Sequence, residues 1–416
     1  MLLDHFERVV AGVEAKLAAA DPSEPIARKT LALEIGRLGT KLFSGRERVA
    51  WCGVLAPFDL LSAMGVTTCF VEFVGAILAG TGAAEPFLVE AEESGYAPDT
   101  CSYHRAVTGA AMQGMMPVPD FLVATSAPCS GGMAVIENLA RHYDRDLFVL
   151  DVPHRRDRDA EQYLADQLRA LTEFVAEHTG EPLDPARLRE AVANTNRARA
   201  LLVETYELAS RVPTPARRRD LINFGIVVSL LMGTERAVTV AEAYRNQFAS
   251  EVARMGHGAQ REHIRLMWLQ NRIQFRNPVD EFLAEDHGAA IVVDELNDIT
   301  WEPIDPEDPF TGMAKRLLTI PLCGSAANRI ANLQRLAREY RVDGAINPCH
   351  WGCRQGTGAR GLVEVGLGAI GVPVLNLELD CIDVRNYADG QTRTRLDAFM
   401  EMISATRDAC DKGSPT

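Results

Sequence analysis

Residues 119–153 read PDFLVATSAPCSGGMAVIENLARHYDRDLFVLDVP, and this stretch decides the fold class. Two short apolar runs, Asp120–Thr125 and Leu147–Leu150, flank a stretch of helical periodicity at Gly132–His142. Alternation of strand, helix and strand indicates a parallel sheet with helices on its faces. Cys129 lies between the first strand and the helix, which is where open parallel sheets bind their ligands.

The same alternation continues on both sides of this unit. Further runs with the apolar character and length of strands are Arg48–Leu55, Val66–Val74, Ile264–Leu269, Ala289–Val293, Gly344–Ile346 and Val372–Leu377. Helical periodicity marks the N-terminus to Ser44, residues 158–262, Ala326–Tyr340, Gly361–Leu367 and Asp389–Ala409. The order of these elements predicts two separate parallel sheets.

We therefore predict an α/β protein with two parallel-sheet, flavodoxin-like domains. The expected segments are a helical N-terminus at residues 1–46, a first α/β domain at 47–157, a helical segment at 158–262 and a second α/β domain at 263–416. A length of 416 residues suits two domains better than one core.

The composition limits the classes of partner. The chain has 43 Lys and Arg against 57 Asp and Glu, a formal net charge of −14 at pH 7. An acidic chain of this kind lacks the basic face that nucleic acid binding needs. Charged residues interrupt the N-terminal apolar pattern, and no apolar run, including Ile222–Met232, reaches the length of a membrane span. We expect a cytoplasmic protein, with Ile222–Met232 as a buried helix.

The chain has nine cysteines, which are the most informative feature of its composition. A disulfide framework is not expected in a cytosolic chain, and Cys69, Cys323 and Cys410 fit ordinary buried thiols. The other six lie near expected strand ends or helix starts: Cys52, Cys101, Cys129, Cys349, Cys353 and Cys381. Helix N-termini favour thiolates, and backbone N–H groups there can hydrogen-bond to the sulfur of an iron–sulfur cluster.

The spacing of these cysteines leaves two alternatives open. Cys349 and Cys353 form a C-x3-C pair, which is neither the C-x2-C of structural zinc sites nor a ferredoxin run. Ser130 and Gly131, beside Cys129, are small enough to let the backbone approach an inorganic cluster. A cluster site and a set of buried thiols are therefore equal alternatives on spacing alone.

Four motifs in order resemble those of 2-hydroxyacyl-CoA dehydratase and benzoyl-CoA reductase subunits: Cys101–Arg105, Pro119–Pro153, Asp343–Arg354 and Glu378–Leu396. The resemblance implies that Cys101, Cys129 and Cys353 hold a [4Fe–4S] cluster whose fourth iron is open to substrate. It also implies a dimer of related subunits, and an ATP-hydrolysing iron–sulfur activator protein that supplies single electrons. In the dehydratases such an electron makes a ketyl radical of the thioester, which allows water to leave.

The three further cysteines depart from the dehydratase pattern. Six thiolates suit two linked [4Fe–4S] cubanes. The resemblance extends to a branch of the family that carries such a double cluster, whose members look like homodimers and reduce small unsaturated molecules. We therefore expect a reductase with a double-cubane [8Fe–9S] cluster on all six cysteines. A dehydratase subunit with one [4Fe–4S] cluster is the alternative, and a non-catalytic electron-storage or cluster-carrier protein is the alternative from another class. No phosphate-binding G-x4-G-K-[ST] pattern occurs, so we expect ATP hydrolysis on the partner.

His104 and His350 adjoin cysteines of these motifs and are candidate proton donors, although each could instead bond to the backbone. Arg105 and Arg354 follow the same cysteines, where a cation would stabilise a reduced cluster. Their alternative is a solvated or ion-paired surface position.

Glu295 follows the expected strand Ala289–Val293, which is a suitable place for an active-site carboxylate. Capping of the next turn by Asp294 is the alternative explanation for this acidic pair. The run Arg217–Arg219 fits a solvated turn or a partner-docking site.

Overall fold

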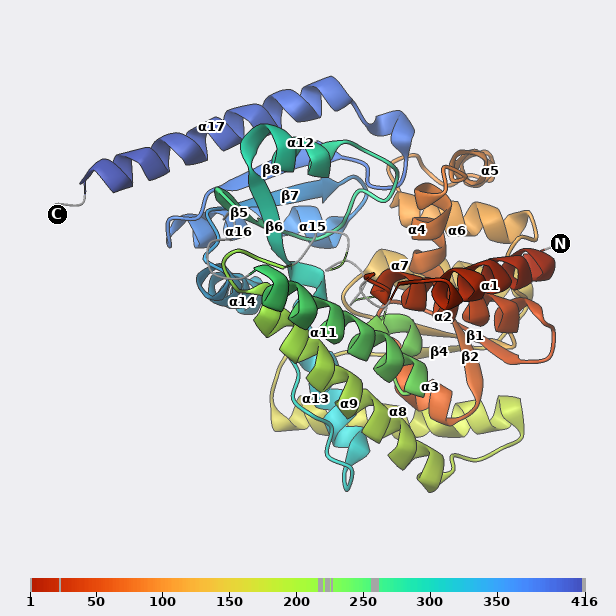
Figure 1. Ribbon diagram of the computed structural model, residues 1–416. Helices are drawn as coiled ribbons and strands as arrows, with labels where there is room; N and C mark the ends of the chain where they lie inside the picture. Colours follow the sequence, from red (N-terminus) through yellow and green to blue (C-terminus); the bar gives the residue numbers. More distant parts are fainter. Residues whose placement is uncertain are drawn as a thin grey trace.

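The computed structural model describes residues 2–413 apart from residues 22–23, 216–219, 221–224, 226 and 256–261. It contains two four-stranded parallel sheets, with strand orders β2-β1-β3-β4 and β6-β5-β7-β8 (Figure 1). The strands are β1 (Arg48–Cys52), β2 (Val66–Phe70), β3 (Phe121–Thr125), β4 (Leu147–Leu150), β5 (Ile264–Trp268), β6 (Ala289–Asp294), β7 (Gly344–His350) and β8 (Val374–Leu379). The prediction of two parallel-sheet α/β domains is confirmed, whereas their exact boundaries stay predictions.

Helices form the rest of the fold (Figure 1). Those that precede or flank the first sheet are α1 (Leu2–Ala18), α2 (Ala27–Phe43), α3 (Phe58–Ala63), α4 (Val71–Gly80), α5 (Glu85–Glu93), α6 (Ser102–Met112) and α7 (Ser130–Tyr143). The segment between the sheets contains α8 (Arg158–Thr179), α9 (Pro185–Ala209), a π-helical turn η1 (Val227–Leu231) and α11 (Glu235–Met255). The second half contains α12 (Val279–His287), η2 (Glu295–Asn297), α13 (Pro309–Thr319), α14 (Ala326–Glu339), α15 (Arg354–Gly358), α16 (Arg360–Gly368), η3 (Val384–Asn386) and α17 (Asp389–Gly413).

Both sheets are covered by helices on both faces, which explains why their strands are apolar throughout. In β1, Val49 and Trp51 pack with α6 and α7, while Ala50 and Cys52 pack with α3, α8 and α13 on the other face. In the second sheet, one face packs on α9, α11 and α14, and the other on α12 and α17. The helical segment between the sheets therefore contributes to the cores of both.

The strand order creates a switch point in each sheet. In the first sheet the chain moves outward from β1 to β2 and then returns to the other side of β1 with β3. The second sheet repeats this order with β5, β6 and β7. Loops at the carboxyl ends of the two central strands diverge at such a switch point and leave a crevice. The loops after β1, β3, β5 and β7 contribute to one cavity between the sheets.

Several expected strand boundaries were wrong: β1 ends at Cys52 and not at Leu55, and β8 spans Val374–Leu379 and not Val372–Leu377. Two further differences affect the site. The expected strand Val66–Val74 ends at Phe70, and α4 begins at Val71 with no intervening loop. The expected strand Gly344–Ile346 continues as β7 to His350, so Cys349 lies within a strand and does not follow one. Beyond Ile346, β7 pairs only with β8, and Pro348 is tolerated where one side of a strand is open.

Several expectations concern the segment before α11. Arg217–Arg219 lies outside the described residues. Of the expected buried helix Ile222–Met232, the described part forms η1, where Val227 and Leu231 are buried. Within the described residues, the helices are either too short or too polar to cross a membrane.

Candidate active site

Three cysteines from different parts of the chain begin helices beside one cavity. Cys101 immediately precedes α6, Cys129 precedes α7 and Cys353 precedes α15. All three line the same cavity, which has a volume of about 340 Å³. The structure therefore brings together a loop of the second sheet and two segments of the first half of the chain.

A glycine allows the cysteine segments of the two halves to meet. Gly352 has φ +76°, and a Cβ atom there would lie 2.4 Å from the backbone N of Cys101 and 2.7 Å from the carbonyl O of Asp99. Glycine adopts this left-handed conformation without strain and has no Cβ to clash. The loop that carries Cys353 thus packs directly on the backbone of Cys101.

Each of the three cysteine sulfurs lies near an N–H group. The backbone N–H groups of Gly132 and Gly356 donate to the Sγ atoms of Cys129 and Cys353, both at 3.3 Å. The side chain of Gln270 adds a longer contact of 3.7 Å from Nε2 to the Sγ of Cys353. Hydrogen bonds of this kind stabilise negative charge on sulfur and tune the reduction potential of an attached cluster.

Burial opposes ionisation of these thiols. Burial and the neighbouring Cys353 raise the pKa of Cys101 well above its usual value, and burial also raises the pKa of Cys129. The expectation that helix N-termini favour thiolates is therefore outweighed here by desolvation. A bound metal group would favour the thiolates strongly.

Three thiols are donors of the type that hold iron–sulfur clusters. Among the described residues, no three His, Cys, Asp or Glu side chains are placed to hold one metal ion. Thiols that line one cavity without converging on a point can each bind a different iron of a polynuclear cluster. Gly131 lies beside this place, since a Cβ atom there would be in ordinary van der Waals contact, 3.6 Å, with the Sγ of Cys129. The residues present therefore fit a [4Fe–4S] cluster with three cysteine ligands.

His350 is fully buried and contacts Cys101. Its Nδ1 atom accepts a hydrogen bond of 3.0 Å from the backbone N of Cys381, and its Nε2 atom lies 3.4 Å from the Sγ of Cys101. Burial lowers the pKa of His350 to about 4, although the nearby Asp380 opposes this shift. The neutral ring therefore carries its proton on Nε2 and donates it to the sulfur of Cys101.

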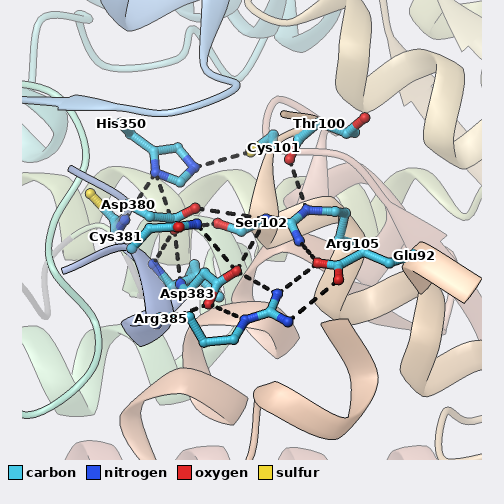
Figure 2. A network of polar contacts seen from close by, with 12 residues as sticks. Glu92, Thr100, Cys101, Ser102, Arg105, His350, Asp380, Cys381, Asp383 and Arg385 are labelled. Atoms are coloured by element: carbon cyan, nitrogen blue, oxygen red, sulfur yellow. Dashed lines mark hydrogen bonds and ion pairs between the residues drawn. The ribbon is translucent and has the colours of Figure 1, made fainter. Parts of the chain in front are cut away.

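A polar network fixes the start of α6 against the segment after β8 (Figure 2). Ser102 donates to Asp380 at 2.5 Å, and the buried guanidinium of Arg105 pairs with Glu92 and lies 3.4 Å from Asp383. Arg105 also donates to the carbonyl O of Thr100. Its charge is thus matched by carboxylates of both halves, and it anchors the Cys101 segment without lining the cavity.

His104 and two further polar side chains lie where the cavity meets the cysteines. His104 is buried, and its Nε2 atom lies 3.6 Å from Oε1 of Glu72. Within the described part of the chain, His104 Nδ1, Glu72 Oε2 and Gln270 Oε1 are buried without a hydrogen-bond partner. Their unmet polar atoms beside the cysteines favour a polar ligand group at this end.

Glu295 does not line the cavity. Its carboxylate is fully buried, forms a two-point ion pair with Arg329 at 2.5 and 2.7 Å, and accepts a hydrogen bond from the backbone N of Gln270. The side chain of Asp294 accepts from the backbone N of Leu296, as capping requires. Glu295 therefore supports the position of Gln270, and its expected catalytic role stays a prediction.

The three additional cysteines lie elsewhere. Cys52 packs in the first sheet and donates to the carbonyl O of Ala50 at 3.7 Å, and Cys381 belongs to an apolar core of the second sheet. Cys349 borders a second pocket of about 310 Å³ together with Arg360 and Glu378. Burial raises the pKa of both Cys52 and Cys349. None of the three lines the cavity of the other cysteines.

The remaining candidates occupy exposed or structural positions. Ser130, Gly131 and Arg354 are exposed at the starts of α7 and α15. Cys69 and Cys323 are buried free thiols, as expected, and burial raises the pKa of each to about 12. The side chain of Cys410 lies outside the described residues.

Two residues of the site were missed by the analysis of the sequence. Glu72 is in the first turn of α4, but the strand-like run Val66–Val74 concealed the start of this helix. Gln270 lies two residues after the end of β5, with φ +56°, and its position near a strand end was the available signal.

The sequence comparisons agree with this architecture. A family model described as "2-hydroxyglutaryl-CoA dehydratase, D-component" matches residues 54–403. The chain belongs to this family. Similar proteins of the dehydratase family include the (R)-phenyllactyl-CoA dehydratase alpha subunit of Clostridium sporogenes, 22% identical over 87% of this chain and 91% of that protein. The alpha subunit of lactoyl-CoA dehydratase from Anaerotignum propionicum is 23% identical over 88% of this chain and 93% of its own length.

A third relative is a reductase component. The B subunit of benzoyl-CoA reductase from Thauera aromatica is 24% identical over 77% of this chain and 80% of that protein. The resemblance noted in the sequence is confirmed, and this chain of the dehydratase family is an enzyme subunit. Its relatives include both dehydratases and a reductase, so family membership alone leaves the reaction open.

Proposed function

We infer that this chain is the iron–sulfur subunit of an acyl-CoA dehydratase or reductase, with one [4Fe–4S] cluster on Cys101, Cys129 and Cys353. The observation that carries this proposal is that these three thiols, from three separate segments, line a single apolar-walled cavity. An iron without a cysteine ligand would supply a low-potential electron and a Lewis-acid position to the substrate oxygen.

The protein's own side chains contribute positioning and the exclusion of water. The backbone amides of Gly132 and Gly356, with the imidazole N–H of His350, stabilise negative charge on the cysteine sulfurs. Apolar side chains exclude bulk water from the cavity, which strengthens electrostatic interactions inside it. His104 Nδ1 and Glu72 Oε2 are placed to accept a proton from a bound polar group.

The relatives are named as alpha or B subunits, which supports assembly with a partner subunit. We propose a dimer, either of two copies of this chain or with a related subunit. The electron donor in this proposal is a separate ATP-hydrolysing iron–sulfur activator, since the chain has no phosphate-binding loop of its own. The eight cysteines whose side chains the structure describes are free, which favours a reducing compartment, and we propose the cytoplasm.

The double-cubane reductase expected from six cysteines remains an alternative. It requires Cys52, Cys349 and Cys381 to join the ligand set, yet these side chains border other cores and another pocket. The geometry therefore favours the single-cluster form, in which these cysteines have structural roles.

Single substitutions to serine test the ligand set. The proposal predicts that Cys101→Ser, Cys129→Ser and Cys353→Ser each lose most of the visible absorption and the EPR signal of the cluster after anaerobic purification, because each removes one of three cluster ligands. Cys52→Ser and Cys381→Ser should keep both signals, and Cys69→Ser serves as a buried control. Equal loss of signal in Cys52→Ser and Cys101→Ser would favour the double cubane.

The reaction itself is tested by supplying the reduced protein and its activator with 2-hydroxyacyl-CoA thioesters. Formation of the unsaturated acyl-CoA identifies a dehydratase, whereas hydrogen added to an unsaturated or aromatic acyl group identifies a reductase. Retention of a stable cluster with neither product would favour the electron-storage alternative.

A further inference from the structure

The lining of the cavity beside the cysteines restricts what can bind there. We propose that the substrate carries an uncharged apolar side chain, aromatic or branched, and a hydroxyl group at the end that meets the cysteines. This inference rests on the proposed function, because the cysteines decide which end of the substrate reacts.

Aromatic side chains form much of the lining of the cavity. Phe58 of α3 and Phe70 of β2 lie edge to face with ring centroids 5.9 Å apart, and Phe73 and Trp301 line the same space. Leu317 of α13 also contributes to this lining. An apolar group that leaves water for such a place gains affinity, about fourfold for each buried methylene.

The basic side chains that line the cavity already have carboxylate partners. Arg316 makes a two-point pair with Asp59 at 2.6 and 2.8 Å, with both side chains buried. Arg272 likewise pairs with Asp294, and its Nη2 lies 2.7 Å from Oδ2.

The acidic side chains that line the cavity would not stabilise an anionic ligand. Asp298 is paired with Arg335, and Glu72 would repel a negative group. A free carboxylate on the side chain of the substrate would therefore meet only basic side chains that already pair with a carboxylate, among the described residues of the lining. Burial of a carboxylate without a cation is costly. The cavity is suited to side chains without charge.

Three unmet polar atoms, those of Gln270, Glu72 and His104, belong to side chains next to the cysteine loops. Gln270 contacts Cys353 through Nε2, while its Oε1 atom lacks a donor in the described structure. Glu72 and His104 lie against Gly132, whose Cβ position would be 3.2 Å from Glu72 Oε1 and 3.3 Å from His104 Nε2.

Two of the three unmet atoms, Glu72 Oε2 and Gln270 Oε1, are acceptors that need a donor. A hydroxyl group supplies one, and a thioester or an unsubstituted aromatic ring does not. The polar end of the cavity therefore favours a 2-hydroxyacyl group over a benzoyl group.

The volume of the cavity is suited to the acyl part of the substrate, which consists of its side chain and the carbons that react. A volume of about 340 Å³ is near the lower limit of pockets that hold whole drug-sized ligands, about 300–1,000 Å³. The acyl part of a thioester fits such a space, and the nucleotide of coenzyme A lies outside it.

Binding without turnover tests this inference. The full-length protein, purified without oxygen and kept oxidised, is titrated by calorimetry with four probes: the CoA thioesters of phenyllactate, 2-hydroxyisocaproate, lactate and 2-hydroxyglutarate. We expect phenyllactyl-CoA and 2-hydroxyisocaproyl-CoA to bind at least about tenfold more tightly than lactyl-CoA, from the added apolar carbons. 2-Hydroxyglutaryl-CoA should bind at least about tenfold more weakly than 2-hydroxyisocaproyl-CoA. Equal or tighter binding of 2-hydroxyglutaryl-CoA overturns the proposal.

A cavity-filling variant provides a second measurement. Ala76 of α4 lines the cavity and is only partly buried, so Ala76→Phe should reduce the affinity for phenyllactyl-CoA about tenfold or more while that for lactyl-CoA changes less. Ile77→Phe, at the next and exposed position, is the matched control and should bind both probes as the parent does. The same loss in both variants, or in neither, contradicts the assignment of this cavity.

The hydroxyl group is tested with 3-phenylpropanoyl-CoA, which differs from phenyllactyl-CoA only by its absence. We expect about tenfold weaker binding of the probe that lacks the hydroxyl, because the acceptors then stay unpaired. Equal affinity contradicts that part of the inference. Iron analysis of the same samples separates this result from the proposed function: an iron-containing protein without apolar preference refutes only the substrate class.

Discussion

Replacement of Gly352 by alanine tests whether the two cysteine loops meet as the structure describes. Gly352 lies in the loop before Cys353, with φ +76°. A new Cβ atom would lie 2.4 Å from the N atom and 2.7 Å from the Cα atom of Cys101. Both contacts involve backbone atoms, so a flexible side chain cannot move aside to relieve them.

The expected cost has two parts. The left-handed conformation costs a residue with a Cβ atom about 1–2 kcal/mol relative to glycine. Overlap in a well-packed place adds about 1–3 kcal/mol, since the two loops must separate to relieve these contacts. Gly352→Ala should therefore destabilise the fold by about 2–5 kcal/mol, and it should also loosen the contact between Cys101 and Cys353.

Gly371→Ala is the matched control. Gly371 has φ +80°, but a Cβ atom there would meet nothing within 4 Å. This variant should show only the conformational cost of about 1–2 kcal/mol. Denaturant unfolding and iron content are measured for both variants, and only Gly352→Ala should lose iron. Equal stability and equal iron in the two variants would refute the direct packing of the cysteine loops.

Three further predictions concern buried polar groups. His350→Phe removes the N–H group that faces Cys101 and should make the cluster harder to reduce, while His350→Gln should restore part of the shift; an unchanged potential in an EPR-monitored redox titration argues against this hydrogen bond. Asp59→Asn leaves the buried Arg316 without a carboxylate and should cost about 3–5 kcal/mol in urea unfolding, whereas the double change Asp59→Leu with Arg316→Met should recover much of it. Burial alone would raise the pKa of Asp59, but the charge and hydrogen bonds of Arg316 hold it below its usual value of 3.8, so this pair stabilises the fold above about pH 4 and its contribution is lost as the pH falls through the lowered pKa. The parent should therefore lose more stability than the double variant below pH 4, and parallel pH profiles would contradict the assignment.

Much of the fold is predictable because the strands are buried on both faces. β3 and β4 are short apolar runs on either side of α7, and their boundaries follow from polar and glycine-rich neighbours. Parallel strands with helices between them also place their carboxyl ends at one edge. This reasoning located Cys129 before a helix and Cys353 after a strand without any knowledge of distances, although the short helix α15 that begins at Arg354 was not expected.

The missed boundaries have local physical causes. The segment Asn347-Pro348 is typical of a turn, yet β7 continues through it because only β8 pairs with that part of the strand. At the end of β2, the chain passes directly into α4, and no loop residue marks the change. These two features moved Cys349 into a strand and concealed Glu72.

Which of the six cysteines line the cavity depends on contacts between segments that are distant in the sequence. Cys101 reaches the cavity because the loop at Gly352 packs on it, and because Arg105 and Ser102 bond to acidic residues of the other half. Such contacts join residues more than 200 positions apart and leave no periodic signal in the sequence. Both Cys353 and Cys381 were expected near strand ends, so the sequence could not show that only Cys353 lines the cavity.

The central claim is that one cluster is held by Cys101, Cys129 and Cys353, and the content of iron and acid-labile sulfide per chain tests it most directly. Protein purified and reconstituted without oxygen should contain about four irons and about four sulfides per chain. About eight irons per chain, or iron-free protein after reconstitution, would contradict the account.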